Sequence, residues 1–225
     1  MPSLDRDGAV FVLDLGDGEN RFHPDWVAET AALLDEVAAA PSPRALVTTA
    51  TGKFFSNGLD LEWLGEHPTE IDPYIAAVHD LFAAVLAFPA PTVAALQGHA
   101  FAAGAMLALA HDARVMRADR GYLCLPEADI NIPFNPGMTA LIQAKLTPAA
   151  AAEAMLTARR YGGEEALAAG LVDDAQRAVD VLPAAIDRAG AQAAKDGGVL
   201  ATIKQRMYAP ALAALADREA NRLAG

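Results

Sequence analysis

The sequence is short of cysteine and of basic residues, and both shortages limit what the protein can be. Cys124 is the only cysteine among 225 residues, which excludes an internal disulfide and a cysteine-based zinc cluster. Lysine and arginine number 17 against 29 aspartates and glutamates, for a formal net charge of −12. A chain this acidic does not bind nucleic acid or an anionic membrane through its overall charge. An anionic ligand therefore needs a local basic patch.

Long apolar runs are also absent. No run reaches the roughly 18 residues that a bilayer-spanning helix needs, and residues 1–8 lack the apolar core of a signal peptide. We therefore expect no membrane partner and a cytoplasmic protein in a reducing compartment. With 53% hydrophobic and 20% charged residues, the chain has enough apolar material for one large core.

Apolar runs alternate with helical patterns along the chain. The predicted strands are 9–15, 45–49, 92–96 and 113–116. The predicted helices are 24–40, 72–88, 102–110, 137–145, 148–157, 163–168, 180–196, 199–208 and one after Pro210. Strand followed by helix, repeated, indicates an α/β fold with mostly parallel strands. We expect an α/β core over residues 1–147 and a helical region over 148–225 that covers the core or packs against another subunit.

Familiar catalytic and metal-binding motifs are missing. The sequence contains no G-x-S-x-G, H-E-x-x-H or Walker A pattern. The histidines have no metal-ligand spacing, so we expect no metal site. His111 follows the apolar predicted helix 102–110, where it is expected to favour the negative end of the helix dipole.

Two glycine-containing segments join a predicted strand to a helix. Residues 51–61 are TGKFFSNGLDL, and residues 94–105 are AALQGHAFAAGA. A junction of this kind presents free backbone N–H groups, which suits an anion or a developing oxyanion. Small side chains also let a ligand approach the backbone closely. Taken singly, each segment is more typical of a tight turn or of close helix packing.

Together and in this order, the two segments resemble the oxyanion loops of the crotonase (enoyl-CoA hydratase/isomerase) superfamily. The likeness runs from Val10 to Leu171, and the string GDGENRF at 16–22 is similar to the Δ3,Δ2-enoyl-CoA isomerases, particularly the plant peroxisomal type. The resemblance implies a ββα spiral core and an acyl-CoA substrate with no other cofactor. It also implies a homotrimer or hexamer built through C-terminal helices, for which the apolar segment 209–223 is the candidate.

The resemblance assigns roles to both loops. The thioester oxygen is expected to accept hydrogen bonds from the backbone N–H groups of Leu59 and Ala103, where Ala103 replaces a family glycine. The residues expected to hold coenzyme A, through loop backbone groups or as phosphate contacts, are Arg21, Lys53, Ser56 and Asn57. The two cations are equally typical of solvated surface charge. The candidates for an apolar acyl pocket, all of them ordinary core residue types, are Leu64, Phe101, Met106, Ile132 and Phe134.

Of the two carboxylates that the resemblance implies for proton transfer, this sequence keeps only one, that of Glu127. Hydratases of the superfamily carry two glutamates, and the matching positions here are Met106 and Glu127. One base suffices to take a proton from C2 and return it to C4, whereas the two-glutamate route to hydration needs a second group. Apolar stretches on both sides of Glu127 predict that desolvation raises its pKa. Asp129 is the rival base, with a loop-capping role as its alternative.

With these residues, the resemblance implies an enoyl-CoA isomerase of fatty acid β-oxidation, which moves the double bond of a 3-enoyl-CoA to position 2. Two alternatives stay open. One is an enoyl-CoA hydratase or another crotonase-type acyl-CoA enzyme, against which Met106 argues. The other is an acyl-CoA-binding protein without turnover, against which Glu127 and the two intact loops argue.

Overall fold

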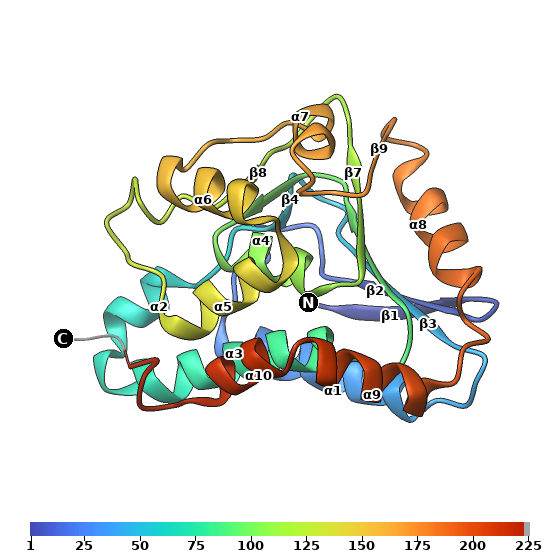
Figure 1. Cartoon of the computed structure of the whole chain (residues 1–225), viewed down its shortest axis with the longest axis horizontal. Coiled ribbons are helices and arrows are strands. Elements are labelled where there is room, and N and C mark those ends of the chain that lie inside the picture. The colour runs from blue at the N-terminus through green and yellow to red at the C-terminus, as the bar shows by residue number, and fades with distance from the viewer. Residues whose placement is uncertain (223–225) are drawn as a thin grey trace.

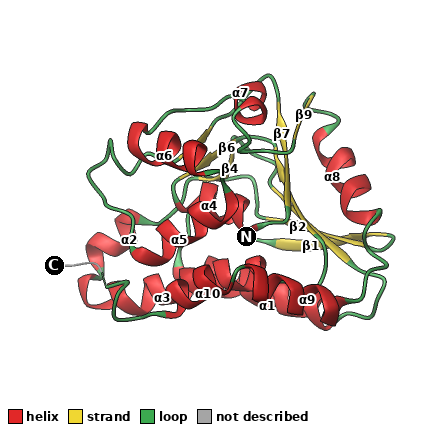
Figure 2. Ribbon diagram, in the orientation of Figure 1, coloured by secondary structure: helices red, strands yellow, loops and turns green. Residues whose placement is uncertain are grey.

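A six-stranded sheet forms one side of the core, as Figures 1 and 2 show. The computed structural model describes residues 1–222. In spatial order the strands are β1 (Ser3–Asp7), β2 (Val10–Asp14), β3 (Ala45–Thr49), β5 (Thr92–Leu96), β7 (Ala113–Arg117) and β9 (Asp174–Gln176). β1 is antiparallel to β2, and every other neighbouring pair is parallel. The mostly parallel core is confirmed.

Three very short strands form a second, parallel sheet. They are β4 (Phe54–Ser56), β6 (His99–Phe101) and β8 (Leu123–Cys124), paired in that order. Each follows a strand of the large sheet and precedes a helix, so the unit strand–strand–helix is repeated three times along the chain. This repeat is the predicted ββα spiral, although the two- and three-residue strands were too short to predict individually.

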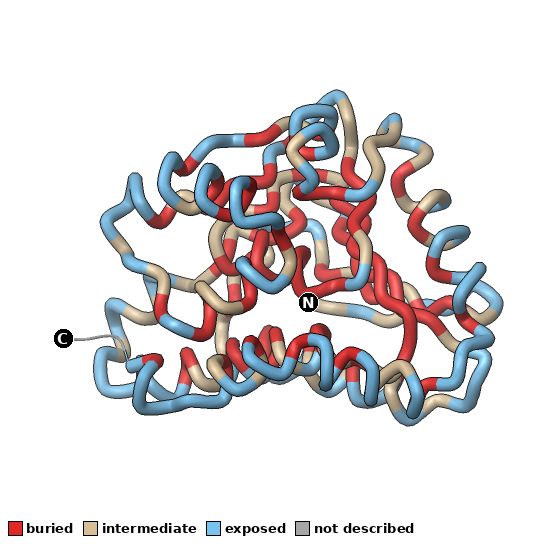
Figure 3. The backbone as a smooth tube through the Cα atoms, in the orientation of Figure 1, coloured by how far each residue is buried: buried red, intermediate tan, exposed pale blue. Residues whose placement is uncertain are grey.

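Helices surround the two sheets. They are α1 (Pro24–Ala39), α2 (Leu61–Glu66), the 3₁₀ turn η1 (Pro68–Glu70), α3 (Ile71–Leu86), α4 (Ala103–Ala110), α5 (Pro136–Lys145), α6 (Pro148–Thr157), α7 (Gly163–Ala168), α8 (Val181–Gly190), α9 (Gly197–Met207) and α10 (Ala209–Ala216). In Figure 1, α1, α3, α9 and α10 lie along one edge of the molecule, while α8 covers the other face of the large sheet. Every residue of α4 is buried, and Figure 3 shows buried backbone concentrated at the strands and this central helix.

Both faces of the large sheet are covered, which explains the continuous apolar runs of β3 and β5. Val47 and Val93 face a small core completed by α8, whereas Leu46 and Leu96 face the main core. The main core draws residues from the N-terminal strands through α10. The chain is therefore packed as one unit across the expected division at residue 147.

Most predicted elements are present, with ends shifted by two residues or fewer. The helix predicted over 180–196 is wrong in length, because α8 ends at Gly190 and the chain then turns. Asp196 ends that turn by capping α9, where its Oδ1 accepts the N–H of Val199 at 2.8 Å. The prediction also missed β9, which lies inside the expected helical region and extends the core sheet beside β7. Leu223, the last residue of the apolar segment 209–223, lies outside the described residues.

His111 does not act as a cation at the end of α4, contrary to the expectation. Its ring is fully buried, with Nδ1 2.9 Å from the carbonyl oxygen of Leu107 and Nε2 2.8 Å from Oγ1 of Thr48. Burial lowers the pKa of His111 to about 4, so the ring is neutral near pH 7 and serves as a polar link between α4 and β3. Among residues 1–222, no helix has the length and hydropathy to cross a membrane.

Candidate active site

The two glycine-containing loops meet in the structure. Gly58 has a φ of +83°, and a Cβ added to it would lie 3.0 Å from the backbone nitrogen of Ala103 and 3.0 Å from the carbonyl oxygen of Phe101. Gly104 lets α4 approach β4, because a Cβ there would overlap the carbonyl oxygen of Ser56. Both contacts require the absence of a side chain. The two glycines thus let the loops pack closely together, and this packing brings the backbone of both loops to the same place.

The N–H of Leu59 is held in position through its own peptide unit. That unit also contains the carbonyl of Gly58, which accepts the N–H of Phe22 at 2.8 Å. Since the C=O and N–H of a trans peptide point in opposite directions, the Leu59 N–H points away from Phe22. No hydrogen bond among the described residues uses this N–H, and Leu59 lines the cavity described below.

The N–H of Ala103 is held in the same way at the start of α4. The carbonyl of Ala102 accepts the first helical N–H, that of Met106, at 3.1 Å, so the Ala103 N–H points out of the helix end. Ala103 is the first residue of α4, and its helical backbone accommodates a Cβ. The strained position is instead Ala102, with a φ of 50° and a ψ of −126°. Ala103 stands where the family has a glycine, and its backbone N–H therefore remains available as a donor.

A cavity of about 270 Å³ lies between the loops and the segment after β8. Of the residues predicted for the site, those that line it are Arg21, Asn57, Leu59, Phe101, Ala103, Met106, Glu127 and Ile132. Ile75 of α3 and Met138 of α5 line it too. Sequence reasoning missed them because both occupy buried stripes of predicted helices, where periodicity does not separate cavity lining from core.

Four predicted residues lie elsewhere. Leu64 and Phe134 are partly buried against the main core and are not among the lining residues, so the structure corrects their assignment to the acyl pocket. Ser56 was expected to contact coenzyme A through its backbone, but the whole residue is completely buried, so neither its backbone nor its side chain is exposed to a ligand. Lys53 is exposed, with its Nζ 5.1 Å from the centre of the Phe54 ring.

Glu127 is the buried acid of the cavity. It follows Pro126 in the segment after β8, and the residue is only 6% exposed. Its Oε2 has no hydrogen-bond partner among the described residues. Loss of hydration on burial raises the pKa of Glu127 to about 7. Asp129, the rival base, is exposed and does not line the cavity. The geometry therefore favours Glu127 as the proton-transfer group.

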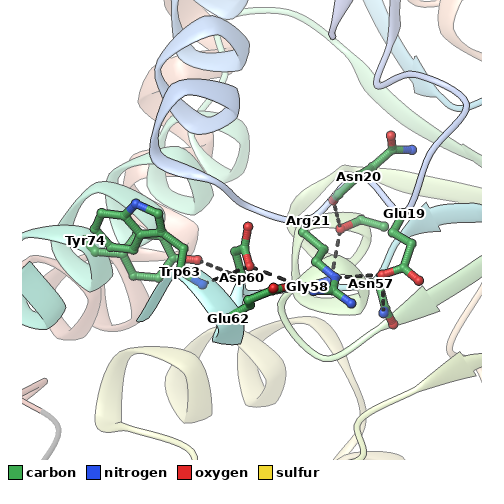
Figure 4. Close-up of polar contacts among 10 residues, drawn as sticks. Glu19, Asn20, Arg21, Asn57, Gly58, Asp60, Glu62, Trp63 and Tyr74 are labelled. Carbon is green, nitrogen blue, oxygen red and sulfur yellow. Dashed lines mark hydrogen bonds and ion pairs between the residues drawn. The ribbon is translucent and has the colours of Figure 1, made fainter. Parts of the chain in front are cut away.

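Arg21 borders the cavity, surrounded by carboxylates (Figure 4). Its Nε is 2.6 Å from Glu19, and its Nη1 is 3.9 Å from Asp60 and 3.7 Å from Glu62. An entering phosphate group has to compete with these three acids for the guanidinium. Among the residues that the structure describes, no group of three or more histidine, cysteine or acidic side chains is arranged to hold a metal ion.

Comparison of the sequence with models of known protein families identifies the family of this chain. The model of the family described as Enoyl-CoA hydratase/isomerase matches residues 5–223. The chain belongs to this family. The resemblance of its two loops to those of the crotonase superfamily is thereby confirmed.

Curated relatives are named as isomerases. Enoyl-CoA delta isomerase 3 of Arabidopsis thaliana is 40% identical over 100% of this chain and 98% of its own length. The peroxisomal enoyl-CoA delta isomerase 2 of the same plant is 40% identical over 92% of each chain. These similarities support the isomerase prediction over the whole length of the chain.

Solved structures agree on the fold. A probable enoyl-CoA hydratase of Mycobacterium tuberculosis superposes with a TM-score of 0.88, at 29% identity over 95% of this chain and 91% of that one. A family member from Pseudomonas syringae gives 0.89 at 24% identity over 98% of both chains, which shows the fold alone. The choice between hydratase and isomerase therefore depends on the site residues, because one fold serves both names.

Proposed function

We propose that this chain is an enoyl-CoA isomerase that converts 3-enoyl-CoA to 2-enoyl-CoA in fatty acid β-oxidation. The observation that carries the proposal is one cavity containing two open backbone N–H groups and a single buried carboxyl. The full-length similarity to plant enoyl-CoA delta isomerases supports it.

The mechanism follows from these groups. The thioester oxygen accepts hydrogen bonds from the Leu59 and Ala103 N–H groups, which stabilise the negative charge that develops there. Glu127, as carboxylate, takes a proton from C2. The electrons of the broken C–H bond form the C2–C3 double bond when the C3–C4 double bond takes up a proton at C4. Glu127 returns its proton at that carbon, so the enzyme ends in its starting state.

Hydration lacks a second acid–base group in this cavity. Met106, on the first turn of α4, faces the site where the hydratases of the superfamily carry a glutamate, and it is 1% exposed. Glu127 is the only acidic residue that lines the cavity in the described chain. A thioether neither gives nor takes a proton, so no second group is available to activate water.

The test is a steady-state assay with a 3-enoyl-CoA and a 2-enoyl-CoA in parallel. We expect isomerisation of the first and no hydration of the second. Hydration without isomerisation would support the hydratase alternative. Binding of both thioesters by calorimetry, with turnover of neither, would support the non-catalytic acyl-CoA-binding protein.

The activity is expected to follow the protonation of Glu127. Because its pKa is raised to about 7 and the carboxylate is the active form, kcat/KM should rise with pH, tenfold per unit below that value, and level off above it. The folded state also binds this proton more tightly than the unfolded chain, whose ordinary value is 4.5. Glu127 therefore reduces the free energy of unfolding as the pH rises from about 4.5 through 7. A pH–rate profile that is flat between pH 5.5 and 8.5 would contradict the assignment.

We also propose a homotrimer or hexamer assembled through the C-terminal helices. Three apolar residues spaced four apart on α9, namely Val199, Ile203 and Met207, are each more than half exposed. This spacing puts them on one face of the helix, which has no partner within the described chain. Light scattering at micromolar concentration is expected to give three or six times the chain mass of 23.4 kDa. A mass equal to that of one chain would refute the assembly.

A further inference from the structure

Residues 57–61 of the first loop have five consecutive backbone N–H groups, and four of these already donate hydrogen bonds within the protein. The four hydrogen bonds are Asn57 N–H to Glu19 O at 2.9 Å, Gly58 N–H to Ser56 Oγ at 3.1 Å, Asp60 N–H to Tyr74 OH at 3.1 Å, and Leu61 N–H to Leu59 O at 3.1 Å. Only the third group, that of Leu59, has no acceptor among the described residues. The two N–H groups next to it are both bound by side-chain hydroxyls.

We propose that the hydroxyls of Ser56 and Tyr74 are positioning groups of the oxyanion hole, because each binds one N–H that flanks that of Leu59. Together they fix the peptide units on either side and leave one donor for the ligand. The inference rests on the proposed function in taking that ligand to be a thioester or its enolate.

Ser56 is placed to act only within the protein. It is completely buried, and its hydroxyl accepts the Gly58 N–H while donating to the carbonyl oxygen of Asn20 at 2.7 Å. The side-chain amide of Asn20 in turn donates to the carbonyl oxygens of Phe54 and Phe55 at 3.2 and 3.1 Å. Through Asn20, Ser56 is thus tied to β4 and to the connection between β2 and α1, which also supplies the N–H of Phe22.

Tyr74 acts from the opposite side. It projects from α3, is 4% exposed, and packs its ring against that of Trp63 with 5.4 Å between centroids. Figure 4 shows the Tyr74 ring beside that of Trp63 and near Asp60, and the two rings are tilted by 33°. Asp60 is also the cap of α2, where its Oδ1 accepts the N–H of Trp63 at 3.3 Å. The hydroxyl of Tyr74 therefore fixes the peptide immediately after the open donor to a rigid helix.

The two hydroxyls keep the neighbouring N–H groups from competing with the Leu59 donor or displacing it. A free N–H on Gly58 or Asp60 would compete with that of Leu59 for the oxyanion. Without its hydrogen bond, the peptide plane of that N–H would also be free to rotate against the neighbouring plane that carries the Leu59 N–H. A misplacement of about 1 Å at a reacting centre costs as much as a hundredfold in rate. Neither side chain lines the cavity, so their loss should affect the stabilisation of negative charge more than the binding of substrate.

The test uses Tyr74→Phe and Ser56→Ala in the full-length protein, with Tyr161→Phe as the matched control. Tyr161 is also fully buried, and its hydroxyl has no hydrogen-bond partner among the described residues. We expect kcat for a 3-enoyl-CoA to fall about ten- to a hundredfold in each test variant, with KM within about twofold of wild type. Tyr161→Phe should keep the wild-type kcat.

A second readout separates positioning from folding and from turnover. Acetoacetyl-CoA ionises at C2 to an enolate with its own ultraviolet absorbance, and an oxyanion hole lowers the pKa of that carbon acid. We expect wild type and Tyr161→Phe to lower the pKa of C2 in bound acetoacetyl-CoA. Tyr74→Phe and Ser56→Ala should lower this pKa by less. If Ser56→Ala fails to fold, Tyr74→Phe alone decides.

The outcomes are distinct. Unchanged kcat and unchanged enolate ionisation in folded Tyr74→Phe would overturn the inference. A fall in kcat that is matched by a rise in KM, with enolate ionisation as in wild type, would overturn it as well. If the wild type ionises bound acetoacetyl-CoA but does not isomerise 3-enoyl-CoA, the proposed reaction fails and the enolate measurement still tests the two hydroxyls.

Discussion

Replacing Glu127 by glutamine is expected to reduce kcat for 3-enoyl-CoA isomerisation by about 10² to 10⁴, the range that general acid–base catalysis supplies. Glutamine keeps the shape of the side chain but does not accept a proton from C2. The cavity holds no other acidic lining residue within the described chain, so no neighbour replaces the lost base. Acyl-CoA affinity should stay near the wild-type value, because the two N–H donors are unchanged.

Asp129→Asn is the matched control for this substitution. It makes the same chemical change two residues away, at an exposed side chain outside the cavity. We expect a wild-type rate for Asp129→Asn, and a residual rate for Glu127→Gln that no longer rises with pH through 7. Equal rates for wild type and Glu127→Gln would place the base elsewhere, and a large loss in Asp129→Asn would identify it.

The core of the fold was readable from the sequence because its signals are local. The strands at 45–49 and 92–96 are buried on both faces, so their apolar runs are uninterrupted and lie where predicted. β1 and β9 were missed for the opposite reason. Four of the five residues of β1 are exposed, no residue of β9 is fully buried, and both strands are defined by their hydrogen-bonded neighbours.

The two loops and the carboxyl were predicted from their resemblance to the crotonase superfamily, because each of them alone is more typical of a tight turn, close helix packing or a surface glutamate. The residues that support the site were not predicted in that role. Tyr74 and Phe22 are ordinary apolar positions in the sequence, and only the folded chain shows one accepting the N–H of Asp60 and the other donating to the carbonyl of Gly58. Ser56 was predicted as a ligand contact, and its complete burial makes it a part of the loop instead.

Gly58→Ala is expected to give the second large loss, because it acts on the donor geometry itself. The new Cβ would lie 3.0 Å from each of three atoms of the second loop, among them the backbone nitrogen of Ala103. Alanine also disfavours the φ of +83° found at this position. The two loops must therefore separate or the turn must change, and either response moves the N–H groups of Leu59 and Ala103 relative to each other.

Loss of one oxyanion-hole donor costs about 10² to 10³ in kcat, and we expect Gly58→Ala to fall in that range. Strain at the positive φ should also lower the free energy of unfolding by about 1 to 3 kcal/mol, so rates are to be measured where circular dichroism shows the variant folded. Gly65→Ala is the control: Gly65 lies in α2, and a Cβ there meets no atom within 4 Å. Alanine favours a helix interior over glycine by about 0.5 to 1 kcal/mol, so this variant should keep its rate and lose no stability. A folded Gly58→Ala enzyme with the wild-type kcat would show that the turn at Gly58 does not set the position of the Leu59 donor.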